Sequence, residues 1–203
     1  MIDPITSFIN TRITNILDPA PVNPTVYEKY LACMFCKNLA DLCETASAVI
    51  NKINRSGKSI DQLPNQSQIA FCKNVLNKYY SDNMFEKDLD NKINWNIIKK
   101  FSESDAHIAY KIYLSIKKNV ILRPESQKIK ESIAKKDKEY FITNFDCLFD
   151  GVSFKEELIL CKNFLINTSI SKDDQEIFWE YFDILLDMCI NEQDILNEIR
   201  NDK

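Results

Sequence analysis

The chain has 203 residues, of which 45% are hydrophobic and 28% charged, so it is long enough to bury a core as one domain. It contains only two glycines, which disfavours folds that need many left-handed turns or a glycine-rich phosphate loop. The only histidine, His107, excludes active sites built on two or more imidazoles. No apolar run reaches the roughly 18 residues of a membrane-spanning helix, so we expect a soluble protein without membrane insertion.

The cysteine pattern indicates core residues rather than a site. The chain has seven cysteines, an odd number, and its N-terminal residues do not show the pattern of a signal peptide, so we expect reduced thiols in a reducing, intracellular compartment. The pair Cys33 and Cys36, followed by Cys43, could chelate zinc or cycle redox equivalents. The three thiols share one face of a predicted helix, and no second ligand pair follows them. We therefore interpret them as packed core side chains, and we expect no metal and no cofactor.

The first 24 residues predict a segment that is separate from the rest of the chain. An amphipathic helix is expected to begin at Asp3-Pro4 and to end at Asp18, and three prolines between positions 19 and 24 then form an extended connector. We expect residues 1–24 to be an arm and residues 25–203 to be a helical bundle domain. The arm lacks a basic face for membranes, so its contacts should lie in a groove of its own domain or of a neighbour. The expected contact residues are Ile5, Phe8, Ile9 and Ile13.

The hydrophobic periodicity predicts an all-α, single-domain bundle of seven to nine helices. Thr25 and Glu28 form a capping box that opens a long helix to about Asn54, and Gly57 ends this unit. Further helices are expected over 69–79, 95–101, 104–120, 124–149, 153–166, 171–188 and 192–200. Ser104, Ser153 and Ser171 are the expected caps of three of them. The helix that follows Ser171 is expected to bury Ile177, Tyr181, Ile184, Leu185 and Met188.

Two short patterns are typical of enzymes, and each also has a simpler interpretation. Gly57-Lys58-Ser59 resembles the end of a phosphate-binding loop, but position 52 is lysine and the segment follows a helix, so an interhelical turn is favoured. Glu103 and His107, four residues apart, could act as an acid–base pair on one helix face. A histidine near a helix N-terminus is more often a surface residue.

Charge is distributed unevenly along the chain. Residues 1–138 hold 21 basic and 15 acidic residues, whereas residues 139–203 hold 5 and 15, which gives net charges of +6 and −10. We name five lysines at the end of the first part the basic flank: Lys128, Lys130, Lys135, Lys136 and Lys138. We name four acids at i, i+4, i+7 and i+11 of a predicted helix the acidic stripe: Glu176, Glu180, Asp183 and Asp187.

The two charged regions allow several interpretations. The acidic stripe is either a solvated helix face or a docking surface for a basic partner, because stacked carboxylates repel one another and favour nearby cations. We expect it to meet the basic flank, within one fold or between copies of the chain. Nucleic acid is not an expected partner, because the basic flank lacks stacking aromatic residues and the sequence pI is about 5.2.

The last third of the chain carries an acidic-aromatic pattern. Glu139-Tyr140-Phe141 and Phe145 precede a turn with Phe154, and a Ser171-capped helix follows with Ile177-Phe178-Trp179. This arrangement resembles a C-terminal segment of uncharacterised proteins of nucleocytoplasmic large DNA viruses. The resemblance implies a viral protein located in the host cytoplasm or the virion, with no catalytic residue to transfer.

Together these patterns predict a non-enzymatic helical interaction protein. We expect a minor capsid or other virion structural component that assembles through protein–protein contacts with itself or with capsid proteins. A viral modulator that binds a host factor is the alternative. An enzyme that uses Glu103 and His107, or the acidic stripe with a metal, is a further alternative, as is a nucleic-acid binder.

Overall fold

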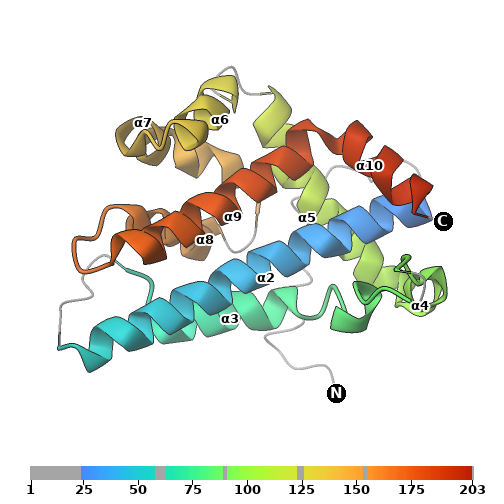
Figure 1. Cartoon of the computed structure of the whole chain (residues 1–203), viewed down its shortest axis with the longest axis horizontal. Coiled ribbons are helices and arrows are strands. Elements are labelled where there is room, and N and C mark those ends of the chain that lie inside the picture. The colour runs from blue at the N-terminus through green and yellow to red at the C-terminus, as the bar shows by residue number, and fades with distance from the viewer. Residues whose placement is uncertain (1–23, 58–62, 89–90, 123–125, 153–154, 203) are drawn as a thin grey trace.

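The computed structural model describes residues 24–57, 63–88, 91–122, 126–152 and 155–202, and these residues form an all-α bundle (Figure 1). The α-helices are α2 (Val26–Arg55), α3 (Gln66–Leu76), α4 (Trp95–Lys100), α5 (Glu103–Leu122), α6 (Ser126–Ala134), α7 (Lys138–Asn144), α8 (Lys155–Cys161), α9 (Lys172–Ile190) and α10 (Glu192–Asn201). The short 3-10 helices are η1 (Asp82–Met84), η2 (Phe145–Phe149) and η3 (Lys162–Leu165). The predicted fold class is confirmed. The predicted arm contacts Ile5, Phe8, Ile9 and Ile13 lie outside the described residues.

Helix α2 begins and ends where its sequence signals predict. The Glu28 amide donates to Thr25 Oγ1 at 3.3 Å, and the Thr25 amide donates to Glu28 Oε2 at 2.7 Å, which closes the capping box. After the last turn, Gly57 adopts φ 69°, a left-handed conformation that glycine accepts without strain. These two signals define a helix of 30 residues.

Helix α2 is the centre of the bundle. It runs the length of the molecule and contacts α3, α5, α9 and α10 (Figure 1). Its buried positions include a series of small side chains, which allow the neighbouring helices to approach closely: Ala32, Cys33, Cys36, Ala40, Cys43 and Ala46. A helix that is apolar on most of its circumference is stable only when other helices cover it, so α2 imposes the arrangement of its neighbours.

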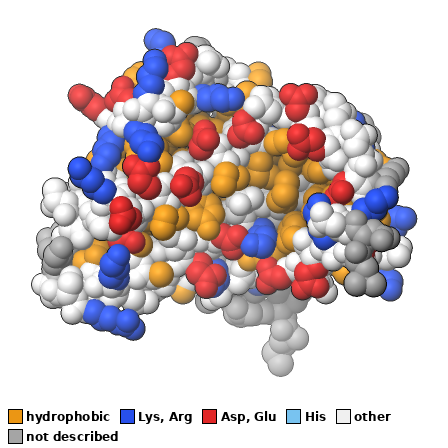
Figure 2. All heavy atoms as spheres, viewed as in Figure 1, with side chains coloured by type: hydrophobic (Ala, Val, Ile, Leu, Met, Phe, Trp, Pro, Cys, Tyr) orange, Lys and Arg blue, Asp and Glu red, His pale blue; other side chains and the backbone are white. Residues whose placement is uncertain are grey.

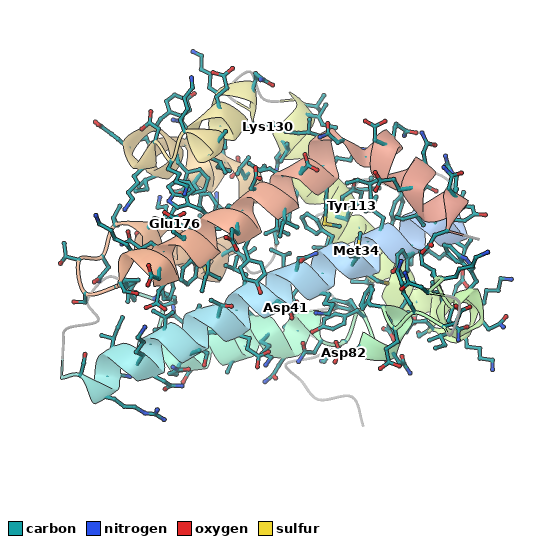
Figure 3. All side chains as sticks on the ribbon, in the orientation of Figure 1. Met34, Asp41, Asp82, Tyr113, Lys130 and Glu176 are labelled. Carbon is teal, nitrogen blue, oxygen red and sulfur yellow. The ribbon has the colours of Figure 1, made fainter. Side chains whose placement is uncertain are left out.

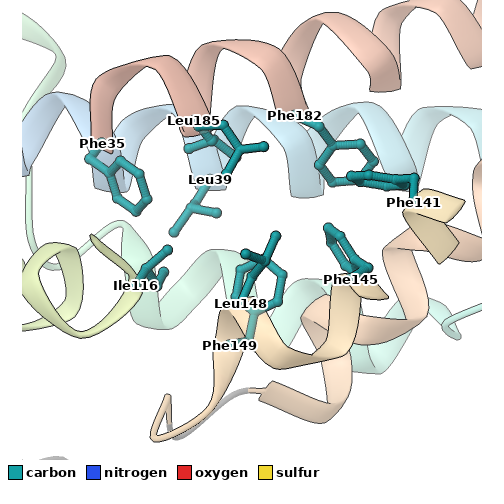
Figure 4. A pocket seen from close by; sticks show the side chains of 10 residues that line it. Phe35, Leu39, Ile116, Phe141, Phe145, Leu148, Phe149, Phe182 and Leu185 are labelled. Carbon is teal, nitrogen blue, oxygen red and sulfur yellow. The ribbon is translucent and has the colours of Figure 1, made fainter. Parts of the chain in front are cut away.

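A second part of the core consists of aromatic rings from the last third of the chain. The Phe141 ring centroid lies 4.9 Å from that of Phe145, 5.0 Å from that of Trp179 and 5.1 Å from that of Phe182. Beside these rings is a small apolar cavity of about 20 Å³, lined also by Leu39 of α2 (Figure 4). The acidic-aromatic pattern of the last third thus includes several residues that pack against one another in the core.

The lysine-rich segment forms two helices, so the single helix predicted over 124–149 is wrong. Helix α6 ends where Lys136 adopts φ 53°. The Asp137 amide donates to Ser132 O at 2.7 Å and the Lys136 amide to Ile133 O at 2.9 Å, the hydrogen bonds of a Schellman motif. Asp137 then caps α7 by accepting from the Tyr140 amide at 3.2 Å. The left-handed turn occurs at a lysine, so no glycine indicates it in the sequence.

Two longer helices, α5 and α9, are each capped by a serine. Helix α5 begins one residue after Ser102, whose Oγ accepts from the Asp105 amide at 3.4 Å, so the cap expected at Ser104 is wrong by two residues. Ser171 caps α9 as predicted, because its Oγ accepts from the Asp174 amide at 3.2 Å. The cap expected at position 153 lies outside the described residues.

An ion pair joins the C-terminal turn of α2 to the first turn of α9. Lys52 Nζ lies 2.7 Å from Asp174 Oδ2. Partial burial raises the pKa of Asp174, but hydrogen bonds from Lys52 and Ser171 and the Lys52 charge outweigh it and hold this pKa below its ordinary value. The ionised carboxylate therefore stabilises the fold above its unfolded-state pKa of about 3.9, and this contribution is lost as pH falls through the lower folded-state value.

We predict that Asp174→Asn makes the acid-side loss of stability shallower between roughly pH 5 and pH 3, because the variant has no carboxylate to protonate at this position. Urea unfolding at a series of pH values measures the slope. Asp173→Asn, an exposed neighbour in the same turn, should retain the wild-type slope. An identical change in both variants would contradict the assignment to the Lys52 pair.

We also predict that Phe141→Ala lowers the free energy of unfolding by about 3–5 kcal/mol, because it removes a buried ring and enlarges the cavity beside it. Thr143→Ala, on the exposed side of the same helix, should change it by less than about 0.5 kcal/mol. Chemical denaturation of both variants tests the prediction, which fails if the two losses are similar.

Candidate interaction surface on helix α9

The buried side of α9 fixes the orientation of this helix. Phe178, Trp179, Phe182, Leu185 and Cys189 are buried against the core. The ring of Phe178 stacks on that of Phe164 in η3 at a centroid distance of 4.4 Å and an interplanar angle of 17°. Such rings each bury 150–250 Å² or so, which outweighs the burial of an isoleucine. The opposite side of α9 is consequently held at the surface.

The expected buried face of this helix is partly wrong. Leu185 and Met188 are buried as predicted, but Ile177 and Ile184 are 39% and 43% exposed, and Tyr181 is half-buried. The physical reason is that the aromatic positions, rotated by about one residue from the predicted face, take the core side. The exposed Ile177 and Ile184, with the half-buried Tyr181 between them, instead form an apolar row at the surface, which we call the apolar stripe.

The apolar stripe lies on a face where hydrophobic side chains gather. In the space-filling view they form a band across the middle of the molecule, over α9 and α2, with charged side chains around it (Figure 2). At the boundary of the two helices, Asn38 Nδ2 of α2 lies 3.6 Å from Met188 Sδ of α9. Contiguous exposed apolar surface of this kind marks sites of contact with other molecules.

The basic flank reaches both ends of the acidic stripe within the same chain. Lys136 forms an ion pair with Glu176, and Lys130 Nζ lies 3.7 Å from Asp187 Oδ1. Figure 3 labels one member of each pair, Glu176 and Lys130. Lys138 Nζ donates to Gln175 Oε1 at 2.6 Å, beside the stripe. The charged regions therefore meet within one fold, because α6 packs on α9. Both ion pairs are half-exposed, so each contributes at most about 1 kcal/mol.

The two acids in the middle of the acidic stripe differ from those at its ends in their ion pairing. Glu180 and Asp183 are exposed, and no ion pair to either is formed by the residues that the structure describes. On the basic flank, Lys135 directly follows α6 and its Nζ lies 3.8 Å from Oε2 of Glu131 in that helix, and Lys128 is exposed. Two carboxylates beside the apolar stripe thus face solvent.

The other candidate sites have ordinary structural environments. Cys33 and Cys36 are buried in α2, and burial raises the pKa of Cys33 to about 12, with a smaller contribution from the charge of Asp105, so this thiol is protonated at neutral pH. Glu103 is 82% exposed and forms an ion pair with Lys29 of α2, and the described residues show no hydrogen bond between Glu103 and His107.

Sequence reasoning missed a polar contact that holds α5 against the junction of α9 and α10. The Tyr113 hydroxyl is buried and lies 3.0 Å from both Met188 O and Glu192 Oε1, so these two acceptors share its single proton. Lys117 forms an ion pair with the same Glu192 carboxylate. Tyr113 and Lys117 both lie on α5, but Glu192 follows them by 75 or more residues, so no local pattern indicates their contact with it.

Neither a metal cluster nor a membrane span occurs in the described ranges. No three side chains among their His, Cys, Asp and Glu residues are placed to hold one ion. The ends of the acidic stripe, Glu176 and Asp187, are separated by about 16 Å along the helix, too far for one metal. None of the described helices has the length and apolarity needed to cross a membrane. No family model matches the chain, and neither a curated protein nor a solved structure matches it.

We predict that Tyr113→Phe lowers the free energy of unfolding by about 1–3 kcal/mol, because it removes the hydroxyl donor shared by the Met188 carbonyl and Glu192 Oε1. Tyr80→Phe is the matched control, since the Tyr80 hydroxyl donates to exposed Asn77 at 2.7 Å, and it should cost less than about 0.5 kcal/mol. Urea titration measures both values. Equal losses would show that the Tyr113 contact has no special role.

Proposed function

We propose that this chain is a non-enzymatic helical interaction protein of viral origin, a minor structural or assembly component of a virion. The exposed apolar stripe of α9 carries the proposal, because isoleucines on the open side of a well-anchored helix gain free energy when a partner covers them. The resemblance of the last third to proteins of large DNA viruses supports the viral assignment. The proposed location is the host cytoplasm or the virion, and the proposed partners are further copies or capsid proteins.

Rigidity favours this use of α9. The aromatic rings on its inner side and the Lys130 and Lys136 ion pairs at its edge hold the helix in place before any partner arrives. A surface that is already ordered loses less conformational entropy on binding than a segment that must fold. A host protein could use the same surface, which makes the host modulator the second candidate.

We predict that Ile177→Ser with Ile184→Ser abolishes partner binding without unfolding the protein, because both side chains are exposed and contribute little to the core. Tagged full-length protein is purified from the cells that naturally produce it, and the proteins that accompany it are quantified by mass spectrometry. The wild type should retain at least one stoichiometric partner, and the variant should lose it. Phe71→Ser, which alters a 36% exposed ring on α3, is the control and should retain the partner.

The identity of the partner distinguishes the two candidates. Copies of the chain or capsid proteins support the structural role, whereas a single host protein supports the modulator. The proposal is wrong if the α9 variant, with an unchanged melting temperature, retains the same partners as the wild type.

A further inference from the structure

Two stripes of different chemistry lie side by side on the exposed face of α9. Each acid of the acidic stripe precedes an apolar side chain by one position, so Glu180 is followed by Tyr181, and Asp183 by Ile184. One residue corresponds to 100° around a helix, which places the acids along one edge of the apolar stripe. A partner that covers the isoleucines must also approach these carboxylates.

The acids of that edge are not equivalent. At its two ends, Glu176 and Asp187 already have lysine partners from α6 and the turn that follows it. Between them, Glu180 and Asp183 have no ion-pair partner in the described part of the chain. The fold thus neutralises the ends of the stripe and leaves two negative charges open at its centre, next to the exposed isoleucines.

The spacing of these groups describes the molecule that fits them. Ile177 and Ile184 are seven residues apart, about 10.5 Å along the helix, and the two open carboxylates are three residues apart, about 4.5 Å. An amphipathic helix presents an apolar row over two turns and two cationic side chains one turn apart on its flank, so it matches both distances. Nucleic acid and anionic lipid do not fit, because the same carboxylates repel phosphate groups.

We propose that the exposed face of α9 binds a basic amphipathic helix of another molecule. Its apolar side chains lie on Ile177 and Ile184, and its lysine or arginine side chains pair with Glu180 and Asp183. This inference rests on the proposed function, because it gives the chemical class of the partner for the same surface. The charges select the partner, and the apolar contact supplies most of the affinity.

Two synthetic helical peptides test the charge selection on the full-length protein. Both carry the same leucine row and a fluorophore, and their flanking positions are lysine in one peptide and glutamate in the other. Fluorescence anisotropy measures their dissociation constants. We expect the lysine peptide to bind the wild type, to bind Glu180→Gln with Asp183→Asn about tenfold more weakly, and to lose affinity as salt rises, because two exposed ion pairs are removed or screened. The glutamate peptide should not bind.

Matched variants separate a charge effect from general damage. Glu86→Gln with Glu156→Gln removes the same charge from exposed sites outside α9 and should leave the affinity for the lysine peptide unchanged. The inference is overturned if the lysine peptide does not bind the wild type, if both peptides bind equally, or if the two neutralised variants behave alike.

The native partner then shows which of the two proposals fails. If Ile177→Ser with Ile184→Ser loses this partner but Glu180→Gln with Asp183→Asn retains it with unchanged affinity, the interaction surface stands and the basic helix is wrong. If both variants retain the partner, both proposals are wrong. If both lose it, and both melt at the wild-type temperature, both proposals stand.

Discussion

The burial of α2 is the constraint on which the arrangement of the other helices depends. A helix of 30 residues with apolar side chains around most of its circumference must be covered on several sides, and α3, α5, α9 and α10 provide the cover. Small residues such as Ala40 and Ala46 set how closely these helices approach. The ion pair between Lys52 and Asp174 then fixes where α9 begins relative to the end of α2.

The exposed face of α9 follows from this arrangement and from the aromatic core. Phe178 and Phe182 take the inner side of the helix, and α6 occupies one edge through Lys130 and Lys136. The side that remains carries isoleucines and two carboxylates, Glu180 and Asp183, to which no described residue forms an ion pair. Folding therefore uses the ends of the acidic stripe for its own stability and leaves the centre exposed, a division that depends on tertiary structure alone.

Local signals in the sequence predict helix starts well and helix rotation poorly. The Thr25 and Ser171 side chains each accept a hydrogen bond from an amide three residues further along the chain. Such caps depend only on neighbouring residues, so the sequence predicts them. No local signal indicates the break at Lys136, because a lysine there adopts a conformation that usually requires glycine or asparagine.

The candidate site could be predicted in part. Its four acids are at helical spacing, so their alignment on one face follows from the sequence. The exposure of Ile177 and Ile184 does not follow from the sequence, because periodicity alone cannot decide which of two overlapping apolar helix faces is buried. The larger area of the aromatic rings at positions 178, 179 and 182 is the signal that distinguishes them. The partners of the acids, and the contact of Tyr113 with Glu192, depend on side chains brought together from distant segments.

Hydroxyl-radical footprinting of the full-length protein, free and in complex with the partner purified from its native cells, tests the role of α9 most directly. Oxidation of Tyr181 and Ile184 reports on the exposed face, and oxidation of Phe71 on α3 serves as the reference. If α9 is the contact surface, Tyr181 and Ile184 become protected in the complex while Phe71 is oxidised as in the free protein. Unchanged oxidation of Tyr181 and Ile184, in a complex that protects another surface, would contradict the role of α9 as the contact surface.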